Sequence, residues 1–410
     1  MKIFYTIHQF FPTYYTGTER YLYNLSKMMQ KYGHQVHIVT YQPNFEEDMT
    51  KIDGLYIKNY IYNNLDITAI HIPGNQPYIS FELENKIIFN FFYKLLKKEK
   101  PDILHITHPM RMTQAFDAAK ALKIKTVMTL TDYWLMCGKG ILLKNNNMAC
   151  MGPGDGTNCK KYCYQQLSKN ILKNRVKKGK NIFNQINKLI ISAKFVSDLY
   201  QLNEYDTSKI EIIRHGFNYF DNYQPIKNGS IKKDFCFGSL GSLIPNKGAN
   251  ILIQAFKMLK NKNIKLKIYG DTTWDKEYFS YLKKLQGNDK RITFEGKYSL
   301  TDTAKIHSEL DVVVQPSLWY ETYPLVCVTS LAYGIPIIVP DLTGSRELVE
   351  DKKNGYIFKF GNAKSLQQKM EQAYNQKMKY NSSIFYNHSV EEESFLTEKL
   401  YLNLINETKK

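Results

Sequence analysis

Long apolar runs, cysteines and targeting signals are scarce in this sequence. No stretch of roughly 18 apolar residues occurs, so no transmembrane helix is predicted. The apolar start, Met1–Tyr5, is too short for a signal peptide. His8 and Gln9 soon interrupt the apolar pattern, and no cleavage site with small residues follows. Six cysteines in 410 residues are too few for a secreted disulfide scaffold. We therefore expect a cytoplasmic protein in a reducing compartment.

Acidic residues are also in deficit. The chain has 38 Asp and Glu residues against 56 Lys and Arg residues, which gives a net charge of +18. Such an excess suits a polyanionic partner, namely nucleic acid, an anionic membrane surface or a phosphorylated substrate. Because no nucleic-acid-binding motif accompanies the charge, we expect no nucleic-acid partner.

Short β-rich runs alternate with longer helical patterns along the chain. This alternation predicts an α/β fold with parallel sheets covered by helices on both faces. The first series of expected strands is Lys2–Phe10, Gln35–Tyr41, Leu55–Tyr62, Ile67–Ile72, Ile103–Ile106, Thr126–Leu130, Leu189–Ser192 and Ile210–Ile213, with a helix over Gly17–Tyr32. The second series is Asp234–Leu240, Ile264–Tyr269, Ile292–Glu295, Val312–Gln315, Ile335–Val339 and Tyr356–Phe360.

A polar break that contains Pro225 and Gly229 separates the two series. We expect residues 218–233 to be a linker between two Rossmann-like domains, residues 1–217 and 234–390, which face each other across a cleft. An amphipathic stretch over residues 391–406 predicts a C-terminal helix that can pack back on the first domain.

Ligands of open α/β sheets bind outside the carboxyl ends of the strands, so the turns after the strands are the places to search. The turn Pro12–Glu19 follows the first strand and contains Gly17. Gly17 can let the backbone approach an anion at the start of the helix. The alternative is an ordinary helix cap, with Thr16 or Thr18 at the N-cap and Glu19 in the first turn.

A second turn, within Phe237–Gly248, follows the first strand of the second domain. Gly241 and the cation Lys247 suit a diphosphate group, although the Gly-Lys-Ser/Thr ending of a P-loop is absent. The alternative is that Lys247 is a solvated surface lysine.

A third turn, within Val312–Val326, holds Glu321 beside Trp319 and Tyr320. A carboxylate at the mouth of a cleft can bind sugar hydroxyls through charge-assisted hydrogen bonds. The alternative is that Glu321 caps the helix that begins near Leu325.

Over nearly the whole chain, these motifs resemble the retaining glycosyltransferases of family 4, which have the two-domain GT-B fold. The strongest resemblance, to the nucleotide-sugar site of that family, lies in Pro316–Glu321, Gly334–Pro336, Gly344–Val349 and Asn354–Gly355. The stretches similar to its diphosphate loop, its N-terminal glycine loop and two further signatures are Gly241–Gly248, Pro12–Glu19, Asp102–His105 and Thr129–Trp134.

The resemblance implies transfer of a sugar from a nucleotide-diphosphate donor with retained anomeric configuration and no required metal or cofactor. Glu321 would bind the donor sugar, and Lys247 would neutralise the diphosphate as charge develops on the leaving group. The other substrate-binding residues that the resemblance implies are Gly17, Thr18, Asp132, Gly241, Ser242, Lys297, Tyr298, Tyr323, Leu325 and Thr329.

Three positions depart from the family pattern. Thr329 stands where the family usually has a second glutamate, Ser242 where it has an arginine, and Thr131 where it has a histidine. One charged hydrogen bond is worth about 1.5–3 kcal/mol, so the three changes together could abolish ordinary donor affinity. The chain is either an active enzyme or a catalytically silent protein that binds a glycan or a partner subunit. We favour the active enzyme, because Glu321 and Lys247 remain.

Four of the six cysteines, Cys137, Cys150, Cys159 and Cys163, lie in one glycine-rich stretch. Four thiolates suit a structural zinc ion, but the long gaps do not match a zinc ribbon. Unligated thiols are the alternative that we favour, and a disulfide is disfavoured in a reducing compartment.

Two helical patterns, Phe81–Lys100 and Gln165–Lys188, are rich in basic residues; the second includes Arg175. Each is either a solvated face over an apolar stripe or a surface that docks on anionic lipid. Because the resemblance assigns the acceptor to the first domain, we favour a glycan or lipid-linked acceptor. We expect a peripheral enzyme of bacterial surface-polysaccharide synthesis (lipopolysaccharide or capsule), bound to the inner face of the cytoplasmic membrane.

Overall fold

The computed structural model describes residues 1–74, 80–218, 234–350, 352–376 and 389–407. The chain divides into two compact units. The first comprises Met1–Leu142, Cys150–Arg214 and Val390–Lys410, and the second comprises Leu143–Ala149 and His215–Ser389. Apart from Asn218, the expected linker lies outside the described residues.

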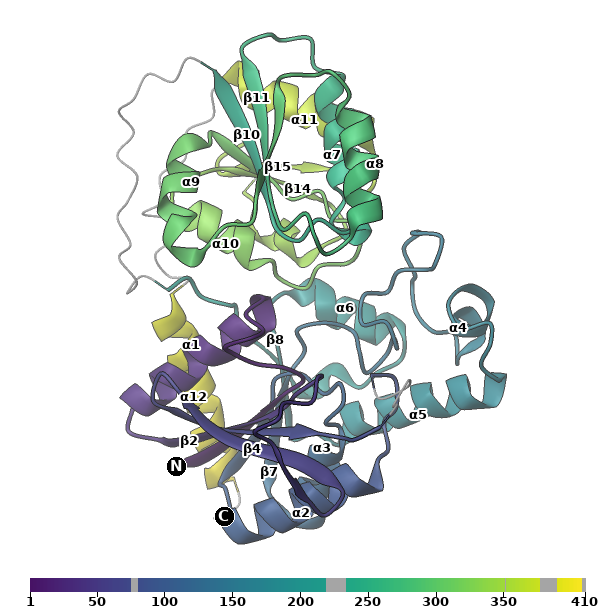
Figure 1. Cartoon of the computed structure of the whole chain (residues 1–410), viewed down its shortest axis with the longest axis vertical. Helices are drawn as coiled ribbons and strands as arrows, with labels where there is room; N and C mark the ends of the chain where they lie inside the picture. Colours follow the sequence, from purple (N-terminus) through teal and green to yellow (C-terminus); the bar gives the residue numbers. More distant parts are fainter. Residues whose placement is uncertain (75–79, 219–233, 351, 377–388, 408–410) are drawn as a thin grey trace. The chain divides into compact units, whose positions relative to one another are not determined.

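The described part of the first unit contains a nine-stranded sheet in the order β3-β4-β5-β2-β1-β6-β7-β8-β9 (Figure 1). Its strands are β1 (Lys2–Ile7), β2 (Gln35–Tyr41), β3 (Thr50–Ile52), β4 (Leu55–Tyr62), β5 (Leu65–His71), β6 (Ile103–Ile106), β7 (Lys125–Thr129), β8 (Lys188–Ile191) and β9 (Ile210–Ile212). Parallel pairing runs from β5 through β2 and β1 to β9, whereas β4 pairs antiparallel with both β3 and β5.

Helices cover both faces of this sheet. They are α1 (Gly17–Lys31), α2 (Lys86–Glu99), α3 (Gln114–Ala121), α4 (Thr157–Tyr162), α5 (Lys169–Gln185), α6 (Lys194–Leu202) and α12 (Val390–Asn406), with the 3-10 turn η1 (Thr207–Lys209). Alternate residues of β1 point to one face, where Ile3, Tyr5 and Ile7 pack in one core with residues of α1 and α12. The basic helices are shorter than expected, because Asn85 caps α2 and Ser168 caps α5 through side-chain hydrogen bonds.

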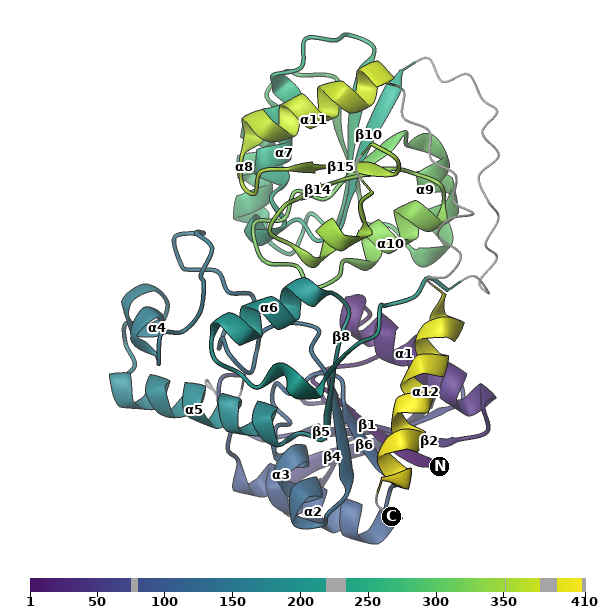
Figure 2. The ribbon, with the colours of Figure 1, turned by 180° about the vertical axis from the view of Figure 1, so that it is seen from behind.

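The C-terminal helix α12 belongs to the first unit and lies beside α1 (Figure 2). The hydroxyl group of Tyr401 lies 3.3 Å from the hydroxyl of Tyr5 and 2.5 Å from Nδ1 of His105. His34 Nε2 lies 2.6 Å from Glu398 Oε1 at the edge of this contact. These polar contacts hold α12 against the rest of the first unit.

The described part of the second unit contains a six-stranded parallel sheet in the order β12-β11-β10-β13-β14-β15. Its strands are β10 (Phe235–Leu240), β11 (Ile264–Tyr269), β12 (Ile292–Gly296), β13 (Val312–Val314), β14 (Ile337–Pro340) and β15 (Gly355–Phe358). Its helices are α7 (Ala249–Lys257), α8 (Lys276–Gln286), α9 (Thr303–Glu309), α10 (Leu325–Ala332) and α11 (Ala363–Gln376), with 3-10 turns η2 (Pro245–Lys247), η3 (Leu300–Asp302) and η4 (Gly344–Leu348). The core lies between the sheet and α7, α8 and α11.

Most strand boundaries shift from the expected ones by one to three residues, and one short strand was not expected. β1 ends at Ile7, so His8–Phe10 form a loop, and β14 begins only after Pro336, which has no N–H for a ladder. The short strand β3 was not predicted, because its three residues are all exposed and carry no apolar alternation. Within the described residues, no helix combines the length and hydropathy needed to cross a membrane.

Candidate functional site

Each sheet reverses its strand order at one point. In the first unit β1 lies between β2 and β6, and in the second unit β10 lies between β11 and β13. Ligands of open α/β sheets bind at the carboxyl ends of the strands where the order reverses. The loops after β1 and β6, and those after β10 and β13, are therefore the places where functional side chains should gather.

In the second unit, the loops after β10 and β13 bring Lys247 and Glu321 together. Lys247 Nζ donates to Glu321 Oε1 at 2.6 Å and also lies 5.4 Å from the centre of the Trp319 ring. The Glu321 side chain is only 7% exposed, whereas that of Lys247 is 34% exposed. The carboxylate is thus fixed inside the unit, and the cation has access to solvent.

Further hydrogen bonds hold the Glu321 carboxylate in place. Ser317 Oγ donates to Oε1 at 2.7 Å, and Trp319 Nε1 donates to the same oxygen at 2.9 Å. The N–H of Gly344 donates to the backbone carbonyl of Glu321 at 2.7 Å. These bonds and the absence of a side-chain cap on α10 remove the alternative that Glu321 caps that helix. Oε2 makes no hydrogen bond within the described residues, which leaves it for a ligand.

Close backbone contacts set the distance between the two loops. Gly248 has a φ of +73°, and a Cβ there would lie 2.0 Å from the carbonyl oxygen of Pro316. The N–H of Leu318 donates to the carbonyl of Asn246 at 2.8 Å. Gly248 therefore has both a conformational and a steric reason to be glycine, and it lets η2 lie against the loop that carries Glu321.

The other expected substrate residues of the second unit lie at the same sheet edge. Gly241, with a φ of +143°, and half-buried Ser242 follow β10, while Lys297 and Tyr298 follow β12. The Tyr298 ring packs against Tyr269, with centroids 6.2 Å apart. Since β11 separates β12 from β10, Lys297 and Tyr298 begin their loop two strands away from the strand that leads to Lys247.

Tyr323, Leu325 and Thr329 continue the chain beyond Glu321. Tyr323 is buried with its ring against His215, at a centroid distance of 6.0 Å. Leu325 begins α10, and half-buried Thr329 lies one turn later on the same face. Thr329 thus offers a neutral hydroxyl where the family pattern has a carboxylate.

In the first unit, Gly17 and Thr18 begin α1, and the helix cap differs from expectation. Thr16 is the N-cap residue, but its hydroxyl makes no cap bond and donates instead to Glu19 Oε2 at 2.6 Å. Gln9 Nε2 donates to Glu19 Oε1 at 3.0 Å, and Glu19 is fully buried. Gly17 is exposed, and nothing lies within 4 Å of a Cβ placed on it.

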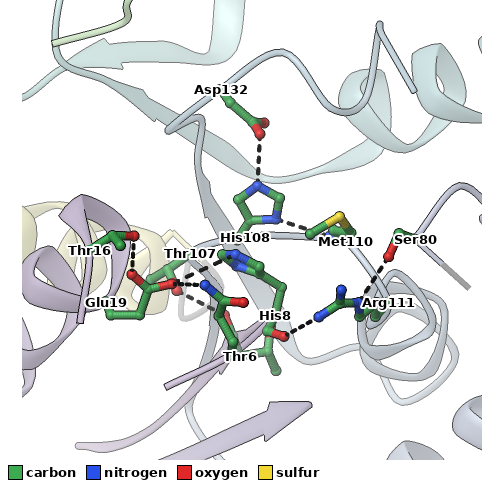
Figure 3. Close-up of polar contacts among 11 residues, drawn as sticks. Thr6, His8, Thr16, Glu19, Ser80, Thr107, His108, Met110, Arg111 and Asp132 are labelled. Atoms are coloured by element: carbon green, nitrogen blue, oxygen red, sulfur yellow. Dashed lines mark hydrogen bonds and ion pairs between the residues drawn. The ribbon is translucent and has the colours of Figure 1, made fainter. Parts of the chain in front are cut away.

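Asp132 follows β7 and contacts a histidine that sequence reasoning missed. Its Oδ1 accepts a hydrogen bond from the N–H of Trp134 at 2.8 Å, and its Oδ2 lies 2.9 Å from His108 Nε2 (Figure 3). His108 follows β6 and also contacts His8, which follows β1; the two ring centroids are 4.1 Å apart. Burial, together with the nearby His108 and Arg111, holds the pKa of His8 well below its usual value.

No local motif links His8, His108 and Arg111, which explains why the sequence did not show them as a site. The sequence also placed His8 inside the expected strand Lys2–Phe10, whereas in the structure β1 ends at Ile7, so that His8 follows it, and His108 lies two residues after β6. Arg111 has a φ of +67° and donates to the carbonyl of His8 at 3.3 Å and to Ser80 Oγ at 3.0 Å (Figure 3).

Arg175 on the basic helix α5 does not lie on the basic surface that the sequence predicted. Arg175 is buried and donates to the backbone carbonyls of Phe81, Trp134 and Leu135, so it holds loops together instead of contributing to a basic surface. Its guanidinium lies 4.7 Å from the Trp134 ring centre. The guanidinium group thus provides hydrogen bonds to three backbone carbonyl groups that lie outside helices and strands.

The cysteine-rich stretch gives no metal centre among the described residues, where no three His, Cys, Asp or Glu side chains are grouped as ligands. In the same part of the chain, Cys137, Cys150, Cys159 and Cys163 form no disulfide. Burial raises the pKa of the Cys137 thiol and raises that of Cys159 to about 12, so both remain protonated near neutral pH.

Comparisons with known proteins match both units. The Glycosyltransferase Family 4 model matches residues 15–219, and the Glycosyl transferases group 1 model matches residues 222–388. An uncharacterized glycosyltransferase of Haemophilus influenzae is 25% identical over 308 residues, which are 73% of this chain and 79% of the relative. One from Methanocaldococcus jannaschii is 28% identical over 205 residues, and the match spans 49% of this chain and only 54% of that relative. The capsular polysaccharide biosynthesis glycosyltransferase CapM of Staphylococcus aureus is 24% identical over 151 residues, 35% of this chain and 38% of the relative.

Solved structures share the fold at low identity. A glycosyltransferase from Rickettsia africae superposes with a TM-score of 0.69 at 17% identity and covers 98% of both chains. HepE from Anabaena, in complex with UDP and glucose, gives a TM-score of 0.68 at 16% identity and covers 98% of this chain and 99% of that chain. The expected GT-B fold is confirmed. Since one family model spans half of the sequence and lies on the unit that holds Asp132 and His108, the chain belongs to glycosyltransferase family 4.

Proposed function

We propose that this chain is a retaining glycosyltransferase that transfers a sugar from a nucleoside diphosphate donor to a glycan or lipid-linked acceptor in bacterial surface-polysaccharide synthesis. The observation that carries the proposal is the Lys247–Glu321 pair at the strand reversal of the second sheet. A lysine provides a compact positive charge for a diphosphate, and a carboxylate binds sugar hydroxyls strongly.

The different exposure of the two side chains suits these two roles. Lys247 can turn toward a diphosphate, because a third of its side chain is exposed. When Lys247 turns toward the diphosphate, Glu321 keeps its hydrogen bonds from Ser317 and Trp319. These bonds hold the carboxylate in its orientation, with Oε2 available for a sugar hydroxyl. As the bond between the sugar and the diphosphate breaks, Lys247 stabilises the charge on the leaving group, and the proposal needs no catalytic metal.

Relatives and structural neighbours support the proposed substrates. Neighbouring HepE structures contain UDP with glucose, UDP and UDP-glucose, and CapM acts in capsular polysaccharide biosynthesis. A relative from Salmonella typhimurium is a lipopolysaccharide 1,2-N-acetylglucosaminetransferase. Thr329 offers one neutral hydrogen bond toward the donor in this proposal, and Ser242 offers another.

The acceptor side of the proposal includes binding to anionic lipid at the inner face of the cytoplasmic membrane. On α5, Lys169, Lys173 and Lys177 are exposed beside Ile171, which is 50% exposed. Each such lysine near an anionic surface contributes about 1 kcal/mol to binding. Flotation with anionic liposomes should weaken when these three lysines become glutamine. Replacing the exposed lysines of α8 (Lys276, Lys283 and Lys284) changes the net charge equally and is the matched control.

A donor screen tests the proposed reaction directly. Thermal shifts with UDP-, GDP-, ADP- and CMP-sugars should identify one donor, which the protein then hydrolyses slowly in the absence of acceptor. Lys247→Met and Glu321→Gln should each abolish turnover. Lys353→Met is the matched control, since Lys353 pairs with Glu350 at 3.1 Å on the surface of the same unit. Turnover that survives the first two substitutions would refute the site, and no shift with any donor would favour a silent glycan-binding or partner subunit.

A further inference from the structure

Two histidines in ring contact lie at the strand reversal of the first sheet, and neither has a role in the proposed donor chemistry. His8 follows β1 and His108 follows β6, and their ring centroids are 4.1 Å apart (Figure 3). Both residues are buried, at 9% and 4% exposure. The position is the counterpart in this sheet of the position that Lys247 and Glu321 occupy in the other sheet.

The His108 ring is fully satisfied. Its Nδ1 accepts a hydrogen bond from the N–H of Met110 at 3.2 Å, so the ring proton belongs on Nε2, which lies 2.9 Å from Asp132 Oδ2. The carboxylate and the backbone thus fix both the tautomer and the orientation of this ring. The family pattern expects an imidazole next to Asp132 at position 131, and here His108 supplies one from the neighbouring strand.

The His8 ring, in contrast, has one nitrogen without a partner. Its Nε2 lies 3.7 Å from Glu19 Oε1, a carboxylate that Gln9 and Thr16 hold in place, and this favours the proton on Nε2. Nδ1 is then a hydrogen-bond acceptor. It is buried and has no partner within the described residues, which is rare for a buried polar atom.

The loop after β6, which holds His108 and contacts the His8 backbone, is strained. Arg111 adopts left-handed backbone geometry, with a φ of +67°, and its guanidinium donates to the His8 carbonyl and lies 5.4 Å from the centre of the Tyr41 ring. Left-handed backbone outside glycine is concentrated at functional sites, where the surrounding contacts maintain it. The contacts of Arg111 fix the backbone of His8, and Asp132 fixes the His108 ring that packs against the His8 ring at an angle of 43°.

We propose that His8 Nδ1 accepts a hydrogen bond from a hydroxyl group of a sugar substrate, with His108 and Asp132 as the residues that position the His8 ring. The inference rests on the proposed function and adds a hydroxyl-binding contact in the first unit. The role is orientation and not proton removal, because burial keeps the pKa of His8 low and the ring is therefore a weak base. The hydroxyl belongs either to the acceptor or to the donor sugar.

Ring-nitrogen NMR of the full chain, labelled with nitrogen-15 in its nine histidines, tests this contact. The His8 signals are those that disappear in His8→Gln. The probes are the methyl glycosides of glucose, galactose, mannose and N-acetylglucosamine, then UDP, and then the nucleotide sugar with the largest thermal shift. A glycoside that moves the Nδ1 signal assigns the hydroxyl to an acceptor, whereas movement with the nucleotide sugar but not with UDP assigns it to the donor.

Two substitutions separate the hydrogen bond from a structural role. His8→Asn keeps an acceptor oxygen at the position of Nδ1, whereas His8→Gln moves it toward the position of Nε2. We expect His8→Asn to retain at least a third of the wild-type affinity for the active probe and His8→Gln and His8→Phe to lose at least tenfold.

Several results would overturn the inference. They are an unchanged Nδ1 signal with every probe up to its solubility limit, equal loss in His8→Asn and His8→Gln, and full affinity in His8→Phe. A normal thermal shift with the nucleotide sugar that the donor screen identifies shows, in the same samples, that the donor site of the second unit is intact, so such a result refutes the His8 contact alone. Absence of a thermal shift with every nucleotide sugar of the donor screen refutes the proposed function instead, while a glycoside-dependent Nδ1 signal would still support the contact.

Discussion

The pairing of Lys247 with Glu321 leads to a prediction about nucleotide binding, for which UDP serves as the probe. A diphosphate must compete with the Glu321 carboxylate for the Lys247 ammonium group, which lies 2.6 Å from Oε1. Glu321→Gln removes this competitor and also removes a negative charge near the diphosphate. We therefore expect Glu321→Gln to bind UDP more tightly than the wild type, although it abolishes sugar transfer.

The exposure of the pair sets the size of this effect. Ion pairs between exposed side chains contribute about 0.2–1 kcal/mol, and hydrogen bonds to charged groups contribute about 1.5–3 kcal/mol. Lys247 is about one-third exposed and Glu321 is buried, so we take a value near the top of the exposed range. A gain of about 1 kcal/mol corresponds to a UDP Kd about fivefold lower.

Calorimetric titration of UDP into four proteins measures the effect and its origin. These are the wild type, Glu321→Gln, Lys247→Met and the double variant. Lys247→Met should bind UDP more weakly, and in its background Glu321→Gln should produce much less than its wild-type gain. With the complete nucleotide sugar, the gain should shrink or reverse, because the neutral amide of Glu321→Gln offers the sugar a weaker bond than the carboxylate does. Weaker UDP binding by Glu321→Gln, or an undiminished gain in the double variant, would refute the competition.

Three further predictions concern single features of the fold. Gly248→Ala should lower UDP affinity by tenfold or more without unfolding the second unit, because its Cβ would lie 2.0 Å from the Pro316 carbonyl oxygen. Calorimetry measures the UDP affinity, and circular dichroism shows whether the unit remains folded. Gly17→Ala should leave the thermal midpoint unchanged or higher, since the site is open and alanine favours helix by about 1 kcal/mol; lost turnover in a stable protein would show that a ligand approaches this backbone. Burial lowers the pKa of His105 from 6.5 to about 3. As the pH falls from 6.5 toward 3, His105 is therefore protonated in the unfolded chain but not in the folded chain, and the free energy of unfolding decreases. Urea unfolding should show a slope of about 1.4 kcal/mol per pH unit from this residue, which His105→Gln should remove; an equal slope in both proteins would contradict the assignment.

Much of the second unit could be predicted from the sequence, because its signals are local. Each strand is a short apolar run, and Lys247 and Glu321 follow such runs within turns that contain glycine or proline. A residue that follows a parallel strand must lie at the carboxyl edge of the sheet, so the order of residues in the chain already limits where the side chain can be. The direct bond between Lys247 and Glu321 was not predictable, since it depends on β10 and β13 being neighbours.

The contacts of the first unit were harder to predict from the sequence, because they join distant parts of the chain. His8 and His108 are 100 residues apart in sequence, and only the pairing of β1 with β6 brings them together. The inward orientation of Arg175 was not predictable for a related reason. Its neighbours on α5 are exposed lysines, and nothing in the spacing shows that this one cation points inward to the carbonyls of Trp134 and Leu135.

The three departures from the family pattern differ in what surrounds them. At position 131 the missing imidazole has a counterpart, because His108 places Nε2 2.9 Å from Asp132. At Thr329 a neutral hydroxyl remains on the face of α10 that also carries Leu325. At Ser242 the lost positive charge has no replacement among the contacts of the described residues, so Lys247 is the cation of this loop that remains near Glu321. The competition between Glu321 and a diphosphate therefore acts on a single lysine, and this is why removing the carboxylate should matter more here than in a loop with two cations.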